Sequence, residues 1–477
     1  MDEIADFGLV VLLVSAGLLL AVLGTRLAAR VSLPNAAIFL AITAVLASAI
    51  EPLGDALTIK EVERIAVVAL VVILFDGGSH IGRARFRRSL APILALGVVG
   101  TFATAGVVTL AAHYVLGFPW IVSGLVGAAI APTDPAVTFS VLGGRELRGR
   151  AGTVLEGEAG TNDPVGIALM IGLIELAHED DGSFSIVVSE FLLEMTVGLA
   201  VGVTGAMLLL PLLRRVHLPS PTLYPLRVLA CAGIVYGIAS VAHGSGFLAV
   251  FVAGVLLGDV AIPRKGEIEA FHSSLAALAE IAAFAALGLS VGFTGLDDAG
   301  IWGQGLVLAF VLAFVARPLA VGPLLLPARM ARGEKLFVVW GGLKGAVPIL
   351  LGALAVLGEV EDSERIYGIV FVVVLFSVVV QGASVPHVAK RLGLPFRAVD
   401  HDLAEVLEYV VRDDAFANGR ALRELPLGDR ARVGVLVRGG RPQAFGPETT
   451  LAPGDRVHVY CQPEDAAALR RIFAGTS

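Results

Sequence analysis

The sequence predicts an all-α polytopic membrane protein that ends in a small α+β domain. Three observations support this fold class. The 477 residues are 56% hydrophobic and only 16% charged, whereas roughly a quarter of the residues in an average soluble domain are charged. Many windows of about 20 residues hold at most one charge, and a helix needs this length to cross a bilayer. These windows end near residue 397, and their length excludes a large soluble enzyme.

Thirteen apolar runs predict thirteen transmembrane helices. The first run follows an acidic start and extends for about 22 residues, which is longer than the apolar core of a secretion signal. We therefore expect no cleavable signal. The runs lie near residues 7–28, 33–50, 62–79, 90–115, 119–142, 152–177, 184–213, 224–241, 243–258, 271–292, 301–326, 335–357 and 364–389.

The charges between the runs predict the orientation of the chain. The loops after even-numbered runs hold only Lys60, Arg64 and Arg365 as basic residues, and are otherwise acidic. The loops after odd-numbered runs hold Arg26, Arg30, Arg83, Arg85, Arg87, Arg88, Arg145, Arg148, Arg150, Arg214, Arg215, Arg227, Arg264, Lys265, Arg329, Arg332, Lys335, Lys390, Arg391 and Arg397. Because basic loops stay in the cytoplasm, we expect the N-terminus outside the plasma (inner) membrane and the C-terminus inside.

Two of the runs are interrupted at their centres. The fifth run contains residues 131–135 (Ala-Pro-Thr-Asp-Pro), and the twelfth contains residues 341–348 (Gly-Gly-Leu-Lys-Gly-Ala-Val-Pro). A charge and freed backbone groups at membrane depth are costly without partners, and paired broken helices near the midplane mark ion sites in secondary transporters. The two runs are seven apart, so they cross the membrane in opposite directions. Their positions predict two inverted six-helix repeats, runs 1–6 and 8–13, with crossed broken helices.

The residues after about 397 predict a small cytoplasmic α+β domain. Residues 403–411 fit either a strand or a helix, and residues 431–438 fit a strand followed by a hairpin turn at Gly439-Gly440. Residues 456–461 predict another strand, and residues 463–473 predict a final helix with acidic residues in its first turn. The sequence thus predicts a transmembrane domain over 1–392 and a cytoplasmic domain over 393–477.

The sixth run carries a carboxylate that we interpret as an ion-binding group. Glu158 and Asn162 are four residues apart and share a helix face, and Asp163 lies about 100° round from Asn162. Pro164 removes a backbone donor and kinks the helix. A carboxylate followed by proline can bind a small cation through its own oxygens and through freed carbonyl groups. The alternative for Asp163 is a buried polar residue with satisfied hydrogen bonds, but intramembrane carboxylates are functional by default.

Asp134 repeats the Asp-Pro pattern in the fifth run. Thr133 offers a hydroxyl group beside it, and the unwound turn offers carbonyl oxygens. These are hard oxygen ligands, which suit Na⁺ or K⁺ rather than soft metals. Asp134 either contacts the cation directly or caps the half-helix that starts at Pro135.

Four further intramembrane charges are expected to be structural. Lys344 would compensate the opposing ends of crossing half-helices, with Glu158 as its partner; a role as a carrier of transported protons is the alternative. Glu280 and Arg317 form the second expected pair, because an unpaired charge at this depth is costly. Asp76, near the cytoplasmic end of the third run, either lines an access funnel or extends toward the interface.

The sequence contains no signal for a cofactor or for enzymatic catalysis. The histidines are scattered near the ends of runs without metal-ligand spacing. A P-loop, a dinucleotide fingerprint and a nucleophile elbow are all absent. Cys231 lies in an apolar run and Cys461 in the polar tail, so no disulfide framework is indicated. We expect no enzyme activity, no cofactor and no nucleic-acid partner.

Together these motifs resemble the cation/proton antiporter-1 (NhaP-like) family over about residues 5–392. The resemblance rests on Thr133-Asp134-Pro135, Glu158, Asn162-Asp163-Pro164, and residues 244–254 and 341–348. It implies a core domain with crossed helices, a dimerisation domain and elevator-type alternating access. It also implies that Asp163 is the shared cation/proton carboxylate, that Asn162 is its partner, and that Thr133 and Asp134 complete the site. Lys344 departs from the arginine usual in the family, and lysine lacks the bidentate fork for Glu158.

The tail resembles a C-terminal TrkA-type (RCK-C) domain over roughly residues 400–475. In the family, such tails accompany K⁺/H⁺ antiporters. The usual Rossmann half is missing, so NAD binding is not implied. A small ligand or a contact between two tails is expected to regulate transport.

The resemblance implies exchange of K⁺, or alternatively Na⁺, for H⁺ by a homodimer in the lipid bilayer. The Asn162-Asp163 pair is similar to that of electroneutral one-for-one exchangers, and the implied role is cytoplasmic cation and pH homeostasis. A gated K⁺ channel or uniporter regulated by the tail is an alternative, although the sequence contains no Thr-Val-Gly-Tyr-Gly filter. A sensor whose tail is the functional module is a second alternative.

Overall fold

The computed structural model describes residues 34–49, 57–142, 145–147, 149–178, 185–291, 300–394, 396–398, 405–427, 431–461 and 465–475, together with residues 12 and 19. The chain divides into two units, Met1–Arg397 and Ala398–Ser477. The first unit is mainly helical, and the second contains a sheet. Almost all of the first predicted run, residues 7–28, lies outside the described residues.

Helices occupy the other twelve predicted runs. The fifth and twelfth runs are each split into two helices, as their central charges, prolines and glycines predict. The helices of this unit are α2 (Asn35–Ala49), α4 (Ile59–Arg88), α5 (Leu90–Leu94), α6 (Thr101–Leu116), α7 (Trp120–Ile130), α8 (Pro135–Ser140), α9 (Ala151–His178), α10 (Ser185–Arg215), α11 (Leu223–Val241), α12 (Gly246–Gly258), α13 (Lys265–Ser290), α14 (Ile301–Val311), α15 (Arg317–Leu325), α16 (Arg332–Trp340), α17 (Ala346–Leu357), α18 (Ser363–Phe376) and α19 (Gly382–Arg391).

Three of the long helices continue through π-helical turns. These turns are η1 (Ala95–Gly100), η3 (Leu312–Ala316) and η4 (Ser377–Gln381), and they join α5 to α6, α14 to α15 and α18 to α19. Such turns often occur at functional sites. Two short strands, β1 (Arg145–Leu147) and β2 (Phe396–Ala398), form a two-stranded sheet.

The described residues contain seven helices that are long and apolar enough to cross a membrane, and α2, α7, α12 and α17 are shorter apolar helices. α9 is less apolar because its first half carries Glu156, Glu158, Asn162 and Asp163. The chain is therefore a multi-pass membrane protein. The seven long helices are Ile59–Arg88, Leu90–Leu116, Val187–Arg215, Leu223–Val241, Lys265–Ser290, Ile301–Leu325 and Ser363–Arg391.

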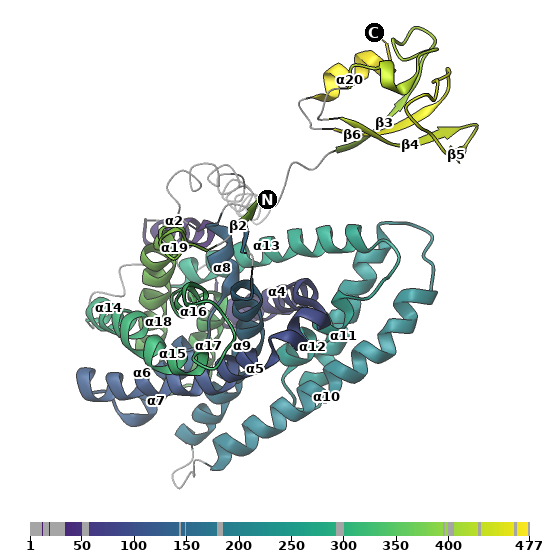
Figure 1. Cartoon of the computed structure of the whole chain (residues 1–477). Coiled ribbons are helices and arrows are strands. Elements are labelled where there is room, and N and C mark those ends of the chain that lie inside the picture. The colour runs from purple at the N-terminus through teal and green to yellow at the C-terminus, as the bar shows by residue number, and fades with distance from the viewer. Residues whose placement is uncertain are drawn as a thin grey trace, which may run out of the picture. The chain divides into compact units, whose positions relative to one another are not determined.

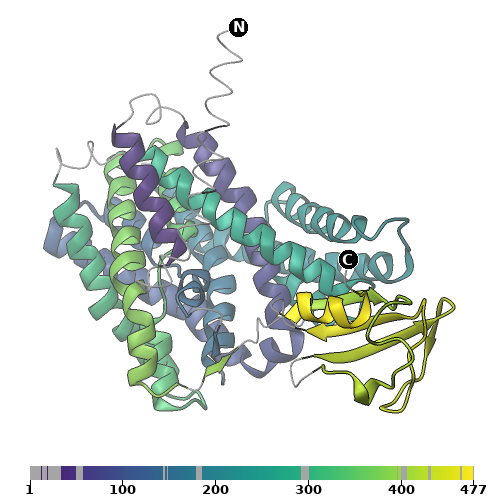
Figure 2. The ribbon, with the colours of Figure 1, turned by 90° about the horizontal axis from the view of Figure 1, so that it is seen from above.

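The helices of the first unit pack as a bundle around α4, α9 and α17. In Figure 1, α10, α11 and α12 lie on one side of this centre, and α14, α15 and α18 lie on the other. α12 packs against α4, and α17 packs against both α4 and α9. Figure 2 shows α2, in purple, beside α13, in teal. The packing places α4, α9, α13 and α17 around a common centre.

The second unit is a small antiparallel sheet with one helix. The strands β3 (Glu405–Val410), β4 (Arg432–Arg438), β5 (Arg441–Gln443) and β6 (Arg456–Cys461) follow the order β3-β6-β4-β5. The predicted strands at 431–438 and 456–461 and the predicted final helix are confirmed; the helix is α20 (Ala466–Phe473), and a short 3₁₀ helix, η5 (Leu422–Glu424), precedes β4. Within residues 403–411, which fitted either element, Glu405–Val410 form the strand β3, and β6 pairs with all six of these residues.

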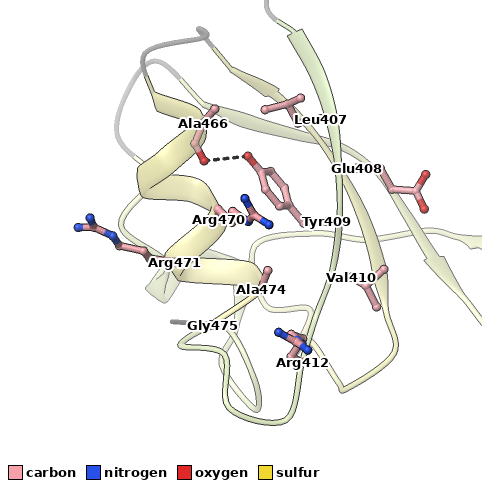
Figure 3. Close-up of a pocket in the computed structure, with 10 residues that line it drawn as sticks. All are labelled: Leu407, Glu408, Tyr409, Val410, Arg412, Ala466, Arg470, Arg471, Ala474 and Gly475. Carbon is pink, nitrogen blue, oxygen red and sulfur yellow. Dashed lines mark hydrogen bonds between the residues drawn. The ribbon is translucent and has the colours of Figure 1, made fainter. Parts of the chain in front are cut away.

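The hairpin turn between β4 and β5 follows the sequence signal. Gly439 and Gly440 have φ of 59° and 74°, and two consecutive positive φ values are typical of the type I′ turn that glycine favours. A cavity lies between β3 and α20 (Figure 3). Across it the hydroxyl of Tyr409 donates to the carbonyl of Ala466 at 3.1 Å, and the Tyr409 ring stacks on Phe473 with centroids 5.6 Å apart.

Asp455 stabilises this unit through an ion pair with a defined pH dependence. Its carboxylate accepts from Arg438 Nε at 2.8 Å and Nη2 at 2.7 Å, and from the Ala452 N–H at 2.8 Å. The hydrogen bond from Arg438 holds the pKa of Asp455 below its usual range. A lowered folded-state pKa stabilises the fold above the unfolded-state value, about 3.9, and this contribution is lost as the pH falls through the folded-state value.

We expect Asp455→Asn to destabilise the second unit by about 1–3 kcal/mol at pH 7, because a charged bidentate hydrogen bond is lost. Hydrogen exchange of the full chain measures this as faster exchange in β3 and β6 than in the wild type. The difference should shrink as the pH falls below about 3.9 and through the lower folded-state pKa, because the wild-type carboxylate then becomes protonated too. Glu448→Gln is the control, because Glu448 is 70% exposed in its pair with Arg423 and such pairs contribute little. Unchanged exchange in Asp455→Asn at pH 7 would contradict this account.

Candidate ion-binding site

The fifth run is broken between α7 and α8. α7 ends at Ile130 and α8 begins at Pro135. Pro132 and Pro135 have no backbone N–H, so helical hydrogen bonds cannot continue through the segment between the two helices. Thr133 in this segment is only 3% exposed. The break therefore presents polar backbone and side-chain oxygens inside the protein.

The twelfth run is broken between α16 and α17, and its break contacts the first one directly. The Asp134 N–H donates to the Leu343 carbonyl at 2.8 Å, and the Thr138 hydroxyl donates to the Gly341 carbonyl at 2.7 Å. The Lys344 N–H donates to the hydroxyl of Ser377 in η4 at 2.9 Å. Residues of each broken segment thus form hydrogen bonds with backbone groups of the other segment. Such bonds are needed because buried backbone N–H and C=O groups are costly without partners.

Gly345 allows the two breaks to approach closely. A Cβ atom at Gly345 would lie 1.9 Å from Asp134 Oδ2 and 2.3 Å from Asp134 Cβ. No side chain larger than hydrogen fits without moving Asp134 or its backbone. The glycine in this motif is therefore required by packing at the site.

We expect Gly345→Ala to lower cation/proton exchange by about tenfold or more, because a displacement of about 1 Å at a binding site has effects of this size. Gly322→Ala in α15 is the matched control, since a Cβ there meets nothing within 4 Å. Exchange rates of equal amounts of the purified variants in liposomes measure the effect. Wild-type exchange by Gly345→Ala would show that the close approach is not needed.

α9 presents Asn162 and Asp163 to the first break. Asn162 and Asp163 are 1% and 5% exposed, and Asn162 Nδ2 donates to Thr133 Oγ1 at 2.8 Å. One oxygen of each side chain, Asn162 Oδ1 and Asp163 Oδ1, is buried without a hydrogen-bond partner among the described residues. A buried carboxylate oxygen without a donor is costly, and a bound cation or proton would satisfy it.

A cavity of about 340 Å³ connects the predicted site residues. Asp163 and Asp134 line it, and so do Asp76 and Glu280 from α4 and α13. The structure therefore brings together two predicted ion ligands, the predicted access residue and one of the predicted structural charges. Thr133 and Asn162 do not line the cavity, but their mutual hydrogen bond ties the first break to the helix that carries Asp163.

The predicted partners of the structural charges are wrong. Arg317 pairs with Glu158, through Nη1–Oε1 at 2.9 Å and Nη2–Oε2 at 3.1 Å, and both residues are 2% exposed. The guanidinium also donates to the carbonyls of Val338 and Val339 at the end of α16. The planar fork of arginine matches a carboxylate with two parallel hydrogen bonds, which a lysine cannot provide. Glu280, the expected partner of Arg317, lines the cavity instead.

Lys344 neutralises the end of α7 rather than pairing directly with Glu158. Its ammonium group donates to the carbonyls of Ala131 and Pro132 at 2.7 Å and 2.9 Å. These carbonyls follow the C-terminus of α7, where the helix dipole favours a cation. These contacts fit the expectation that Lys344 compensates a half-helix end, but its hydrogen-bond partners are these carbonyls and not Glu158.

Asp76 lies at the part of the cavity lined by α4 and α13. Asp76 Oδ2 is 3.4 Å from His80 Nδ1, and Asp76 Oδ1 accepts from the Ser273 hydroxyl at 3.4 Å. The Asp76 side chain is 14% exposed and that of His80 is 49% exposed. Because both line the cavity, this arrangement fits the access-funnel interpretation of Asp76 better than extension toward the interface.

Sequence reasoning missed several polar residues that brace the site. Ser377 donates to Gln381 Oε1 at 3.2 Å, and Gln381 Nε2 donates to the Trp340 carbonyl at 2.9 Å, which fixes the end of α16. Glu156 and Ser273 line the cavity. The signal for Ser377 and Gln381 was their i, i+4 spacing in an otherwise apolar run.

The polar groups at the two breaks are oxygen ligands of the kind that bind hard cations. Within the described part of the chain, no group of three or more His, Cys, Asp or Glu is arranged to hold a metal ion. The groups at the breaks are carboxylate, hydroxyl, amide and carbonyl oxygens, which are hard ligands.

Known protein families and individual proteins match this chain over most of its length. Residues 3–391 match the family described as Sodium/hydrogen exchanger, transmembrane, and residues 406–474 match the TrkA-C domain. The K(+)/H(+) antiporter NhaP of Alkalimonas amylolytica is 32% identical, over 98% of this chain and 84% of its own length. The K(+)/H(+) antiporter NhaP2 of Shewanella sp. (strain ANA-3) is 30% identical, over 99% of this chain and 84% of its own length.

A solved structure supports the fold of the membrane unit. The sodium proton antiporter MjNhaP1 of Methanocaldococcus jannaschii superposes with a TM-score of 0.68 at 22% identity, covering 80% of this chain and all of MjNhaP1. The family match covers more than half of the chain and includes both broken helices and α9. The chain therefore belongs to the sodium/hydrogen exchanger family of membrane transporters and carries a TrkA-C domain at its C-terminal end.

Proposed function

We propose that this protein exchanges a monovalent cation for H⁺ by competition at Asp163. The observation that carries the proposal is the buried Asp163 carboxylate, whose Oδ1 has no hydrogen-bond partner among the described residues, beside a cavity where two broken helices meet. A single carboxylate cannot hold a cation and a proton together. Occupancy by one ion therefore excludes the other, and this exclusion couples the two fluxes.

K⁺ is the favoured cation and Na⁺ the alternative. The 32% and 30% identical relatives are named K(+)/H(+) antiporters and align over nearly the whole chain, including the TrkA-C domain. A 28% identical relative named Na(+)/H(+) antiporter NhaH, from Halobacillus aidingensis, aligns over only 72% of this chain. In the proposal, Thr133 and Asp134 add oxygen ligands, and Asn162 holds Thr133 in place.

The exchange is proposed to be electroneutral, one cation for one proton. No net charge then moves, so concentration gradients alone drive it. One unit of pH supplies about 1.4 kcal/mol per proton, which balances a roughly tenfold cation gradient. This stoichiometry suits a role in cytoplasmic cation and pH homeostasis.

The proposal includes the larger architecture predicted from the sequence. Thirteen spans form two inverted repeats, and a core that carries α7–α8 and α16–α17 moves by an elevator-type motion against a dimerisation domain. The transport domain covers residues 1–392, and the cytoplasmic domain over 393–477 regulates it through a small ligand or a tail–tail contact. The protein works as a homodimer in the plasma membrane, with its N-terminus outside.

Reconstitution into liposomes that contain a pH-sensitive dye tests the proposal. Adding K⁺, Na⁺ or Li⁺ in turn should produce proton movement with K⁺, and less or none with Li⁺. An imposed membrane potential should leave the rate unchanged. Dependence on the potential would contradict electroneutrality, and single-channel currents at saturating K⁺ would support the channel alternative instead.

A further inference from the structure

Glu280 belongs to the cavity of the ion site. It lies on α13, and Ser273, Ala276, Ala277 and Glu280 line the cavity together. Their spacing of three, four and seven residues places them on one helix face. The two alanines are small, so this face leaves room beside Glu280. The face of α13 that lines the cavity therefore carries the Glu280 carboxylate, and Asp163 on α9 lines the same cavity.

The carboxylate of Glu280 has no structural partner in the described part of the chain. Its Oε1 is buried and accepts no hydrogen bond from a described residue. The residue with which the sequence paired it, Arg317, is fully engaged with Glu158 and two carbonyls. No ion pair among the described residues includes Glu280. A structural role as one half of a charge pair is therefore not supported.

A second feature of the cavity points to a cationic ligand. Asp163 is 95% buried, lines the same cavity and also has an oxygen without a donor among the described residues. Glu280 and Asp134 line this cavity as well. Like charges in a poorly solvated cavity repel each other, and a cation between them removes that repulsion.

Resting on the proposed exchange function, we infer that Glu280 is a positioning residue for the transported cation. Its negative charge, on the α13 wall, raises the occupancy of the cation in the cavity and guides it to Asp163 on the α9 wall. Glu280 is not itself the exchange carboxylate, because the breaks of α7–α8 and α16–α17 meet at Asp134 and Lys344 and not at α13. A cavity lined by one sign of charge concentrates counter-ions in this way.

The test is the dependence of exchange on K⁺ concentration in liposomes at pH 8.5, where few protons compete. Glu280→Gln keeps the shape of the side chain and removes its charge, so the KM for K⁺ should rise by about tenfold while kcat changes by less than about twofold. Glu280→Asp keeps the charge and should recover most of the loss. Glu267→Gln, on the exposed first turn of α13, should match the wild type.

The outcomes separate this inference from the proposed function. An unchanged KM in Glu280→Gln, or a loss of kcat alone, overturns the role of Glu280. Glu280→Asp that behaves like Glu280→Gln also overturns it, because the claim concerns charge. If Glu280→Gln does not fold, the KM for K⁺ is measured in Glu280→Ala, which also removes the charge and should show the same rise in KM. Asp163→Asn is measured alongside. Exchange that persists in Asp163→Asn contradicts the proposed function. Loss of exchange in Asp163→Asn, together with a wild-type KM for K⁺ in Glu280→Gln, contradicts only the role of Glu280.

Discussion

Asp163→Asn is expected to reduce cation/proton exchange to the level of empty liposomes, a loss of about a hundredfold or more. Asparagine has nearly the shape of aspartate, but it carries no charge and cannot exchange a proton. In the variant, α9 no longer offers the cation a charged ligand beside the two breaks. The carboxylate that binds the transported proton is also gone. The measurement is dye-reported proton movement after addition of K⁺, with equal amounts of protein in each preparation.

The variant should remain folded, which separates the loss of function from misfolding. Asp163 forms no ion pair among the described residues, so its replacement leaves no buried partner unpaired. Removing a buried charge of this kind is neutral or stabilising, and the melting temperature in detergent should be equal to or higher than that of the wild type. Glu175→Gln is the control, because Glu175 is an exposed residue at the far end of the same helix. Exchange at the wild-type rate by Asp163→Asn would refute the assignment.

Arg317→Met is expected to have the second large effect, this time on stability. Glu158 would remain buried at 2% exposure with its guanidinium partner removed. Removing one partner of a buried pair costs about 3–5 kcal/mol. The carbonyls of Val338 and Val339 would also lose their donors. We expect a lower melting temperature in detergent and a lower yield of folded protein.

The double variant Glu158→Gln/Arg317→Met tests whether this cost comes from the stranded charge. Since neither ion remains, the double variant should be more stable than Arg317→Met alone. The coupling energy of the pair is the destabilisation of the double variant minus the sum of the destabilisations of Glu158→Gln and Arg317→Met. Lys344 donates to carbonyls and not to Glu158, so it cannot replace Arg317. A double variant that is less stable than either single variant would show that the pair is not the source of the effect.

Much of the fold could be predicted from the sequence because the bilayer imposes simple rules. A helix that crosses it must be apolar over about 20 residues, and twelve of the predicted runs coincide with helices. The charge and the prolines or glycines at the centres of the fifth and twelfth runs locate the two helix breaks, because such residues interrupt an apolar helix. In the tail, Gly439-Gly440 locates the hairpin because only glycine adopts two positive φ values readily.

The pairing of the charges could not be predicted, because it depends on which side chains the packing brings together. Glu158 and Arg317 are 159 residues apart in sequence, and nothing in either segment selects the other over Lys344 or Glu280. The fork of Arg317 suited a carboxylate, and the carbonyls freed by Pro132 and Pro135 suited a lysine. The position of Glu280 on the cavity required the packing of α13 against α4, which no local pattern encodes.

The claim on which the account depends is that the cation and the proton compete for Asp163. The most direct test is the KM for K⁺ measured at a series of pH values in liposomes with equal pH on both sides before K⁺ is added. Competition predicts that KM rises as the pH falls, approaching about tenfold per pH unit once the site is mainly protonated, while the rate at saturating K⁺ changes little. A KM for K⁺ that stays constant over the pH range in which the exchange rate changes would contradict the account.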